Sequence, residues 1–296
     1  MEDNSQMKIL ITGGSGLLGQ ALMNSFNDEE IYGTYFEHSV VQNKLLYLDI
    51  TSEKEVTLLI QKIKPRVVIH TAAMTDVDDC EVYPQKAMQV NAEGTRNLII
   101  AANQIGAKFV YLSTDYVFNG KKGLYKEEDP VAPINVYGES KLAGEKIVLQ
   151  GCRDFIIART SVLYGSTEGN FATWLLGQLE QKKQLSIVDD QYASPTYNRD
   201  LAEQIKILIQ NDEHGIFHTA GAERMNRYQF ALKVADFFGY DTTLIKPVDI
   251  NTLPWIAKRP HDSSLDISKI SPFKKPYKIH QALGELHEEL RGVNPV

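Results

Sequence analysis

A tyrosine and a lysine four residues apart, Tyr137 and Lys141, have the side chains and the spacing that acid catalysis needs. Residues four apart on a helix share a face, so the phenol and the ammonium would lie side by side. A neighbouring ammonium stabilises phenolate and lowers the tyrosine pKa from its usual value of about 10. A decrease of roughly three units would make the phenol a usable acid near neutral pH. Because a half-buried tyrosine beside a solvated lysine gives the same spacing, the rest of the chain must decide.

A glycine-rich segment near the start of the chain could bind the phosphates of a dinucleotide. Residues 8–12 form a short apolar run typical of a strand, and Gly13, Gly16 and Gly19 follow at once. Residues 20–26 then have helical spacing. A strand, a glycine turn and a helix give the context of a dinucleotide-binding fingerprint, in which the backbone comes close to a pyrophosphate. A plain glycine-rich turn between a strand and a helix is the alternative.

The ends of the next two predicted strands offer contacts for an adenosine. After residues 31–36, Glu37 could bind a ribose 2′-hydroxyl, whereas His38 and Lys44 would favour a 2′-phosphate. Both NADH and NADPH therefore remain open. Asp49 ends a further short apolar run and could contact an adenine edge, or could be only a turn residue.

Two more strand ends carry small or polar residues. The apolar run 67–71 is followed by Ala72, Ala73, Met74 and Thr75, where the backbone of a cofactor could approach or where helices could pack tightly. The run 109–112 leads into hydroxyl and carboxylate side chains, at the edge where open α/β sheets bind ligands. These residues are Ser113, Thr114, Asp115 and Tyr116.

Strands and helices alternate along the first half of the chain, which predicts an α/β fold with a doubly wound parallel (Rossmann) sheet over residues 1–160. Helices are expected at 52–63, with Ser52 as cap, and at 84–105, with Gly106 as terminator. Beyond residue 160 strands and helices no longer alternate regularly, and a smaller, irregular α/β substrate-binding domain is expected over residues 161–296. A segment near 185–210 would return to the first domain. The later helices are expected at 170–181, 200–209 and 225–238.

Composition excludes some classes of partner. The net charge of −7 and the pI near 5.6 argue against a nucleic-acid partner and against an anionic membrane surface. Cys80 and Cys152 have no metal-ligand spacing around them, so neither a disulfide nor a metal site is expected. No apolar run approaches the ~20 residues that span a bilayer. The first six residues lack the regions of a signal peptide and are expected to be frayed. A cytoplasmic protein is the resulting expectation.

Taken together, these pieces resemble the extended short-chain dehydrogenase/reductase superfamily, and within it most closely the dTDP-4-dehydrorhamnose reductases. The glycine motif alone marks only the superfamily. The pair Ser-Thr-Asp-Tyr-Val-Phe and Asn-Val-Tyr-Gly-x-x-Lys-Leu-Ala-Gly-Glu is specific to this branch. The similar stretches are residues 12–19, 70–78, 113–120, 133–145, 190–196 and 259–266.

The resemblance implies a role for each candidate residue. Tyr137 would donate a proton to the 4-keto oxygen of a nucleotide-linked 6-deoxy sugar, with hydride coming from NADPH or NADH. Lys141 would bind the nicotinamide ribose and lower the tyrosine pKa, and Thr114 would hydrogen-bond the reacting oxygen. Asp115, Tyr116 and Arg259 would bind the substrate between the two domains, and no metal is assigned. The cofactor would contact Gly13, Gly16, Leu17, Leu18, Gly19, Tyr35, Asp49, Ile50, Ala72, Ala73, Met74, Thr75, Tyr137 and Lys141.

Two departures from the family pattern keep other functions open. Val162 replaces an aromatic residue that packs on the sugar, and Ala193 replaces a glycine. The β regulatory subunit of methionine adenosyltransferase resembles this chain as well, and in that case Tyr137 and Lys141 would only hold a nucleotide while the chain binds a partner. The tail 291–296 is short for such binding. Another nucleotide-sugar reductase or epimerase is the third alternative, and a homodimer is compatible with each.

Overall fold

The computed structural model describes residues 6–37 and 45–292. The expectations for the start of the chain, for His38 and Lys44 beside the ribose, and for the end of the 291–296 tail lie largely or wholly outside these ranges.

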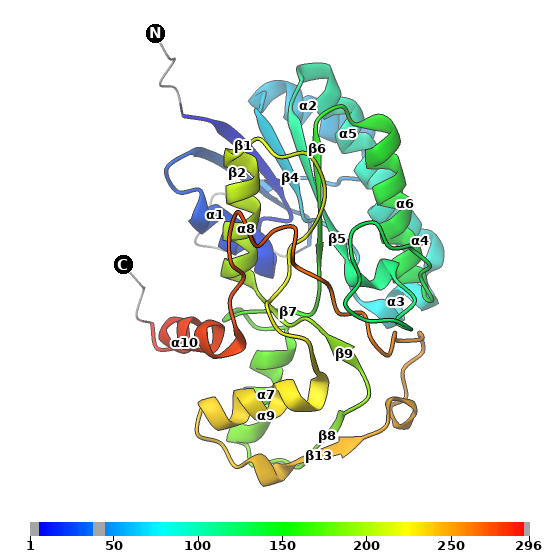
Figure 1. Cartoon of the computed structure of the whole chain (residues 1–296). Coiled ribbons are helices and arrows are strands. Elements are labelled where there is room, and N and C mark those ends of the chain that lie inside the picture. Colours follow the sequence, from blue (N-terminus) through cyan, green and yellow to red (C-terminus); the bar gives the residue numbers. More distant parts are fainter. Residues whose placement is uncertain (1–5, 38–44, 293–296) are drawn as a thin grey trace.

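A seven-stranded sheet forms the larger part of the molecule (Figure 1), and every strand pairing in it is parallel. The strand order β11-β6-β5-β4-β1-β2-β3 reverses direction between β1 and β4, so a ligand crevice is expected at the carboxyl ends of these strands. The predicted doubly wound parallel sheet is confirmed. The strands are β1 (Lys8–Thr12), β2 (Glu30–Tyr35), β3 (Leu46–Tyr47), β4 (Val67–His70), β5 (Lys108–Thr114), β6 (Phe155–Thr160) and β11 (Gly215–His218).

Helices cover both faces of this sheet because successive strand residues point to opposite sides. Ile9 and Ile11 of β1 pack into a core with α1 (Leu17–Ser25) and α8 (Asn198–Gln210). Leu10 packs into a second core on the other face. That face is covered by α2 (Glu53–Ile63), α5 (Gly94–Ile105) and α6 (Val136–Gly151).

The helix predicted over residues 84–105 forms as three consecutive helical segments. It consists of α4 (Pro84–Met88), a π-helical turn η1 (Gln89–Glu93) and α5, and Gly106 ends it at φ +68°. A short helix that was not predicted, α3 (Val77–Val82), precedes it. Ser52 caps α2 by accepting a hydrogen bond from the Glu55 amide, as predicted.

The smaller part has its own apolar core, formed by α7 (Phe171–Glu180), α9 (Arg227–Phe237), α10 (Ile279–Leu290) and a strand pair. The pair joins β8 (Leu185–Val188) to β13 (Ile245–Val248) in parallel. The remaining elements are short: β7 (Leu163–Tyr164), β9 (Tyr192–Ala193), β10 (Thr196–Tyr197), β12 (Met225–Asn226), η2 (Asp115–Val117), η3 (Thr242–Leu244) and η4 (Ile250–Thr252).

Within the predicted return segment 185–210, the part that packs on the large sheet begins at residue 198. Residues 185–188 belong to the smaller part, whereas α8 packs on α1 and β11 pairs with β6 as the edge strand. Strand β11 was not predicted. The division into residues 1–160 and 161–296 stays a prediction, with 198–218 as the segment that crosses it.

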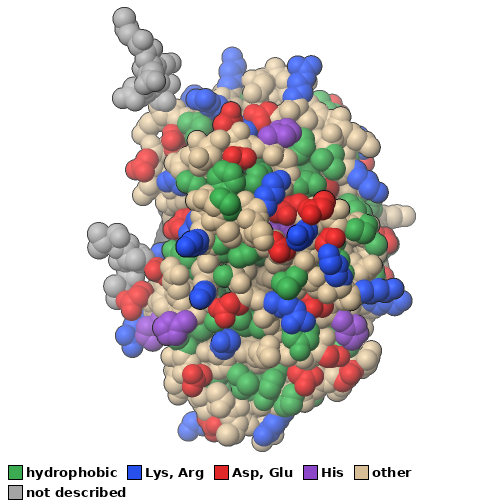
Figure 2. All heavy atoms as spheres, viewed as in Figure 1, with side chains coloured by type: hydrophobic (Ala, Val, Ile, Leu, Met, Phe, Trp, Pro, Cys, Tyr) green, Lys and Arg blue, Asp and Glu red, His purple; other side chains and the backbone are tan. Residues whose placement is uncertain are grey.

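The outer surface mixes charges of both signs. Figure 2 shows lysine and arginine side chains interspersed with aspartate and glutamate over the face in view. Within residues 6–37 and 45–292, no helix combines the length and the apolar character needed to cross a bilayer.

Candidate active site

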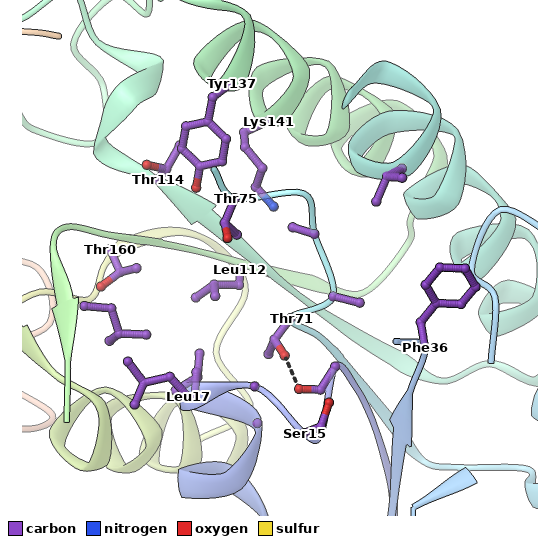
Figure 3. A pocket seen from close by; sticks show the side chains of 18 of the residues that line it. Ser15, Leu17, Phe36, Thr71, Thr75, Leu112, Thr114, Tyr137, Lys141 and Thr160 are labelled. Atoms are coloured by element: carbon purple, nitrogen blue, oxygen red, sulfur yellow. Dashed lines mark hydrogen bonds between the residues drawn. The ribbon is translucent and has the colours of Figure 1, made fainter. Parts of the chain in front are cut away.

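A cavity of about 790 Å³ opens at the carboxyl ends of β1, β4 and β5 and reaches the amino ends of α7 and α9. Figure 3 shows Tyr137, Lys141 and Thr114 on one side of it and Ser15, Leu17 and Thr160 across from them. Met74, Tyr116 and Arg259 were predicted as contacts but do not line it. The predicted residues that do are Gly13, Gly16, Leu17, Leu18, Gly19, Tyr35, Asp49, Ile50, Ala72, Ala73, Thr75, Thr114, Asp115, Tyr137 and Lys141.

The glycine turn can accept a pyrophosphate. Gly13 has φ +72°, a conformation that glycine adopts at little cost, and its carbonyl accepts a hydrogen bond from Gly16 N at 3.0 Å. A Cβ on Gly19 would collide with the backbone of Gly13, so this glycine permits close packing of α1 on the turn. The cap of α1 is Gly16, which has no side chain to satisfy the first amides, and Gly16, Leu17 and Leu18 line the cavity.

Tyr137 and Lys141 lie in the first turns of α6, and both line the cavity. The Lys141 side chain is 4% exposed, and its ammonium lies 4.2 Å from the centre of the Tyr111 ring. Burial lowers the pKa of Lys141 to about 7, and the carboxylate of Glu145 partly opposes this shift. A buried ammonium is therefore close to losing its proton at neutral pH.

The pKa of Tyr137 shifts in the direction opposite to the prediction. Burial raises the pKa above its ordinary value, a side-chain hydrogen bond with Thr114 lowers it, and the charge of Asp115 raises it again. The predicted lowering by Lys141 was wrong because burial disfavours both charged forms, the phenolate and the ammonium that would stabilise it. Tyr137 is accordingly a fully protonated phenol at neutral pH.

Thr114 and Asp115 end β5 beside the phenol. The Thr114 hydroxyl accepts a hydrogen bond from Tyr116 N at 3.2 Å and donates to Asp115 Oδ1 at 3.1 Å. The buried Asp115 carboxylate also accepts from Ser161 at 2.7 Å and from Ser263 at 2.5 Å. Burial raises the Asp115 pKa, while the three hydroxyls lower it. One carboxylate thus joins the ends of β5 and β6 to a loop of the C-terminal region.

Tyr116 packs against Tyr137 without lining the main cavity. Its ring meets the Tyr137 ring edge-on with centres 5.9 Å apart, and its hydroxyl accepts a hydrogen bond from Gln191 Nε2 at 3.2 Å. Burial raises the pKa of Tyr116. Tyr116 therefore packs against the proposed acid while its own hydroxyl is occupied.

Two buried groups position α6 against the sheet. Asn91, in the π-helical turn, accepts from Met74 N at 2.8 Å and donates to Met74 O at 3.0 Å and to Ser140 Oγ at 2.9 Å. These bonds fix the backbone of the 72–75 loop, and they explain why Met74 supports the cavity without lining it. Glu145 forms two hydrogen bonds with Arg159, at 2.9 and 2.8 Å. This buried ion pair links α6 to β6.

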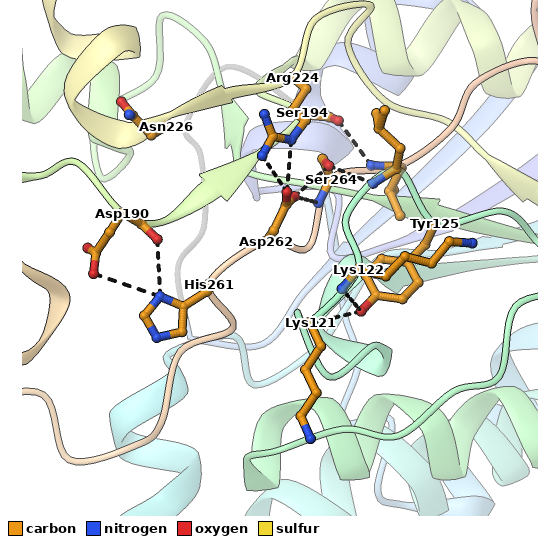
Figure 4. A network of polar contacts seen from close by, with 12 residues as sticks. Lys121, Lys122, Tyr125, Asp190, Ser194, Arg224, Asn226, His261, Asp262 and Ser264 are labelled. Atoms are coloured by element: carbon orange, nitrogen blue, oxygen red, sulfur yellow. Dashed lines mark hydrogen bonds and ion pairs between the residues drawn. The ribbon is translucent and has the colours of Figure 1, made fainter.

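Arg259 lies outside the main cavity and forms an ion pair with Asp78. Its Nη1 lies 3.0 Å from Asp78 Oδ1, its guanidinium lies 5.1 Å from the centre of the Trp255 ring, and its side chain is 10% exposed. It lines a second cavity of about 630 Å³ together with Asn119, Gly120, Lys121, Ile134, Lys258 and His261. Figure 4 shows His261 turned toward Asp190 and Lys121 pointing away from the neighbouring polar network.

Arg227, Asn170 and Phe171 line the main cavity but were not predicted. Arg227 is the first residue of α9, where the helix dipole disfavours a cation. A basic residue near the start of the helix predicted over 225–238 was thus a signal for a ligand contact. Val162, which was singled out as a departure, does line the cavity, at φ +30°.

The residues present fit a dinucleotide. Thr160 Oγ1 lines the cavity, is buried and has no hydrogen-bond partner among residues 6–37 and 45–292, so a ligand amide could satisfy it. Cys80 and Cys152 are free and buried. Among the described residues, no group of three or more His, Cys, Asp or Glu side chains is placed to hold a metal ion.

A glycine turn at the switch point of a parallel sheet, facing a Tyr-x-x-x-Lys helix, defines a dinucleotide-binding protein of the short-chain dehydrogenase/reductase class. The model of the RmlD substrate binding domain family matches residues 7–291, so the chain belongs to this family.

Two relatives and one solved structure illustrate what the chain is similar to. A dTDP-4-dehydrorhamnose reductase of Aggregatibacter actinomycetemcomitans is 35% identical over 275 residues, 89% of this chain and 92% of that protein. The methionine adenosyltransferase 2 subunit beta of Rattus norvegicus is 32% identical over 286 residues, 92% of this chain and 85% of that protein. A solved structure of a Bacillus anthracis dTDP-4-dehydrorhamnose reductase in complex with NADP has a TM-score of 0.88 and 33% identity, covering 96% of this chain and 99% of that one.

Proposed function

We propose that the chain is an NAD(P)H-dependent reductase that converts dTDP-4-dehydrorhamnose to dTDP-L-rhamnose. The observation that carries this proposal is the placement of Tyr137, Lys141 and Thr114 in one cavity with the glycine turn of α1. The related reductases, similar over most of both chains, support the same activity.

The chemistry is the addition of a hydride and a proton to a carbonyl group. When bound, the nicotinamide supplies the hydride to C4 of the sugar. The protonated Tyr137 phenol donates its proton to the 4-keto oxygen as negative charge develops there, and the Thr114 hydroxyl orients that oxygen. Lys141 binds the nicotinamide ribose from the same helix face, and the product is an alcohol.

The remaining site residues are assigned by position. The glycine turn, the 72–75 loop, Tyr35, Asp49 and Ile50 hold the dinucleotide, as NADPH or NADH. Asp115, which lines the main cavity, faces the sugar, and Tyr116 supports the site by packing on Tyr137. Arg259 shares the second cavity with Lys121, Lys258 and His261, and the charges of the arginine and the two lysines suit the diphosphate of a nucleotide sugar. Local cations matter because the whole chain has a net charge of −7.

Location and assembly are part of the proposal. Two free, buried cysteines agree with a reducing compartment, which supports a cytoplasmic protein. A homodimer is proposed as the assembly, and light scattering on the eluted peak of a sizing column measures its mass.

A nucleotide-binding regulatory subunit is the second candidate. It is favoured by the relatives named methionine adenosyltransferase 2 subunit beta and by Val162, which lines the cavity where the reductase pattern has an aromatic residue. Under this function, Tyr137 and Lys141 would bind the dinucleotide without turnover.

The deciding experiment is an NAD(P)H-oxidation assay with dTDP-4-dehydrorhamnose beside other 4-keto nucleotide sugars. Turnover of dTDP-4-dehydrorhamnose supports the proposed reductase, and preference for another sugar identifies a different substrate for the same reaction. Cofactor binding without oxidation by any of these sugars would favour the regulatory subunit.

A further inference from the structure

A five-residue strap crosses from the smaller part of the molecule to the sheet part. Residues 255–259 follow η4 and run toward α3, as the orange segment in Figure 1 shows. Asp78, in the first turn of α3, receives three hydrogen bonds from the strap at a single oxygen. The donors are Ile256 N at 3.1 Å, Ala257 N at 2.9 Å and Arg259 Nη1 at 3.0 Å.

Asn135 fastens the strap at a second point. Its Nδ2 donates to Lys258 O at 2.8 Å, while its Oδ1 accepts from Gly138 N at 2.8 Å and so caps α6. The side chain is 3% exposed. Because the two ends of one amide are rigidly joined, fixing the nitrogen on the strap fixes the oxygen that caps the helix.

The same corner contains a third bond. Glu81 Oε2, one turn after Asp78 on α3, accepts from Val136 N at 3.1 Å. The strap, α3 and the first turn of α6 therefore form a closed ring of contacts. Tyr137 lies inside that first turn, next to Val136.

We propose that Asn135 is a positioning residue that couples the strap to the first turn of α6, and so links binding of the anionic end of the substrate to the placement of Tyr137. This inference rests on the proposed reductase function for its substrate. The strap supplies Lys258 and Arg259 to the second cavity, and Ile134, directly before Asn135, lines the same cavity. A nucleotide diphosphate held there contacts the strap and the residue before the cap together.

The coupling has a simple physical cause. If the strap leaves, the buried Asn135 Nδ2 loses its acceptor, and an unsatisfied buried donor is costly. The amide then turns to find another partner and gives up its cap on Gly138 N. Strap docking and helix capping are consequently formed or lost together.

Trp255 allows this to be tested without any substrate, because it lies in the strap and the chain has only one other tryptophan, Trp174. In a Trp174→Phe background, acrylamide quenching of Trp255 fluorescence reports release of the strap. Asn135→Asp keeps an oxygen that caps the helix but removes the donor to Lys258 O. Asp78→Ala removes the other fastening, and Asp79→Ala, an exposed acidic residue in the same helix turn, is the matched control.

Quenching is expected to increase in Asn135→Asp and in Asp78→Ala and to stay at the parent value in Asp79→Ala. Unchanged quenching in both test variants would overturn the fastening of the strap. Because this measurement needs no turnover, it tests the fastening of the strap even if the reductase assay finds no substrate and the proposed function fails.

Kinetics with the nucleotide sugar then test the link to Tyr137. Asn135→Asp and Asp78→Ala should each raise KM and lower kcat, with a loss in kcat/KM of about tenfold, and leave the Kd of NADPH unchanged. Combined, they should lose little more than the larger single effect, because both act through the strap. Strictly additive losses, or a change in KM alone, would show that the strap holds substrate without positioning Tyr137.

Discussion

Burial acts on both members of the Tyr137 and Lys141 pair, and it favours the neutral form of each. The phenol keeps its proton at neutral pH, while the ammonium titrates at a pH of about 7. A proton donor of this kind gives up its proton only when negative charge develops on the acceptor oxygen. The site therefore suits the reduction of a carbonyl better than the storage of a phenolate.

Tyr137→Phe removes the proposed acid while keeping the ring that packs on Tyr116. The rate of NAD(P)H oxidation should fall by about 10²–10⁴-fold, the usual contribution of a general acid. The Kd of the cofactor should change little, because the ring and Lys141 remain. Stopped-flow oxidation and fluorescence titration of NADPH measure the two quantities, with the exposed Tyr83→Phe as control. Full activity in the Tyr137 variant would refute the mechanism.

Lys141→Met should stabilise the protein while weakening cofactor binding. The Lys141 pKa is lowered from 10.5 to about 7 by burial. The unfolded chain thus binds a proton that the folded chain does not between these two pH values, and wild-type stability rises with pH across this window. The penalty that the variant removes is at most about 5 kcal/mol, is fully present below pH 7 and vanishes above pH 10.5.

The measurement is the difference in urea midpoint between Lys141→Met and the wild type at several pH values. The advantage of the variant should be greatest near pH 6 and should shrink as the pH approaches 10. An advantage that grows with pH would contradict the assigned shift.

The glycine turn between β1 and α1 works as one element, in which the third glycine sets the packing. A Cβ on Gly19 would meet the carbonyl of Gly13 and the Cα of Gly14, so Gly19→Ala must displace the turn. A cost of about 1–3 kcal/mol and loss of NADPH binding are expected. In α7, Gly177→Ala meets no atom within 4 Å and should stabilise the helix by about 0.5–1 kcal/mol. Thermal melts and cofactor titration of both variants measure the contrast.

The sequence predicted helix boundaries well where a single residue determines the end of the helix. Ser52 caps α2, Gly106 ends α5 in a left-handed conformation, and Asn226 caps α9, all at or within two residues of the expected positions. The capping Asn226 also belongs to β12, so the helix begins later than its apolar pattern suggested. Such boundaries depend on contacts within a few residues, which the sequence displays directly.

Contacts between segments far apart in the chain were harder to predict from the sequence. Strand β11 is recognised only by its parallel register with β6, some sixty residues earlier in the chain, and β8 pairs with β13 rather than with the sheet. The contact of Arg259 with Asp78 could not be foreseen, because it comes from a helix that was not predicted, and the role of Arg259 at the substrate stays a prediction. The direction of the Tyr137 pKa shift depends on burial, which a sequence spacing does not give.

At the scale of the whole molecule, the main cavity lies where the two parts of the chain meet. The dinucleotide side comes from β1, β4 and β5, whereas Phe171 and Arg227 come from the first residues of α7 and α9 in the smaller part. A substrate that reaches both sides holds the parts together. The net charge of −7 makes the few cations at this junction important for an anionic ligand.

Arg227→Met tests that role. Arg227 Nε donates to Gln191 Oε1 at 3.3 Å, its guanidinium lies 5.1 Å from the centre of the Phe171 ring, and its charge lowers the pKa of Asp115. Since a hydrogen bond to a charged group contributes about 1.5–3 kcal/mol, the KM for the nucleotide sugar should rise by about 10–100-fold. The NADPH Kd should stay the same, because the dinucleotide is held by the sheet part.

Arg224→Met is the matched control. This arginine lies three residues earlier and pairs with Asp262 at 2.6 Å, outside the main cavity (Figure 4). Both variants lose one positive charge, so a purely long-range effect of net charge on substrate binding would change the two KM values equally. A specific rise for Arg227→Met alone would place the anionic substrate against α9. Equal KM values in both variants would instead remove Arg227 from the substrate site and leave the smaller part with only its apolar wall.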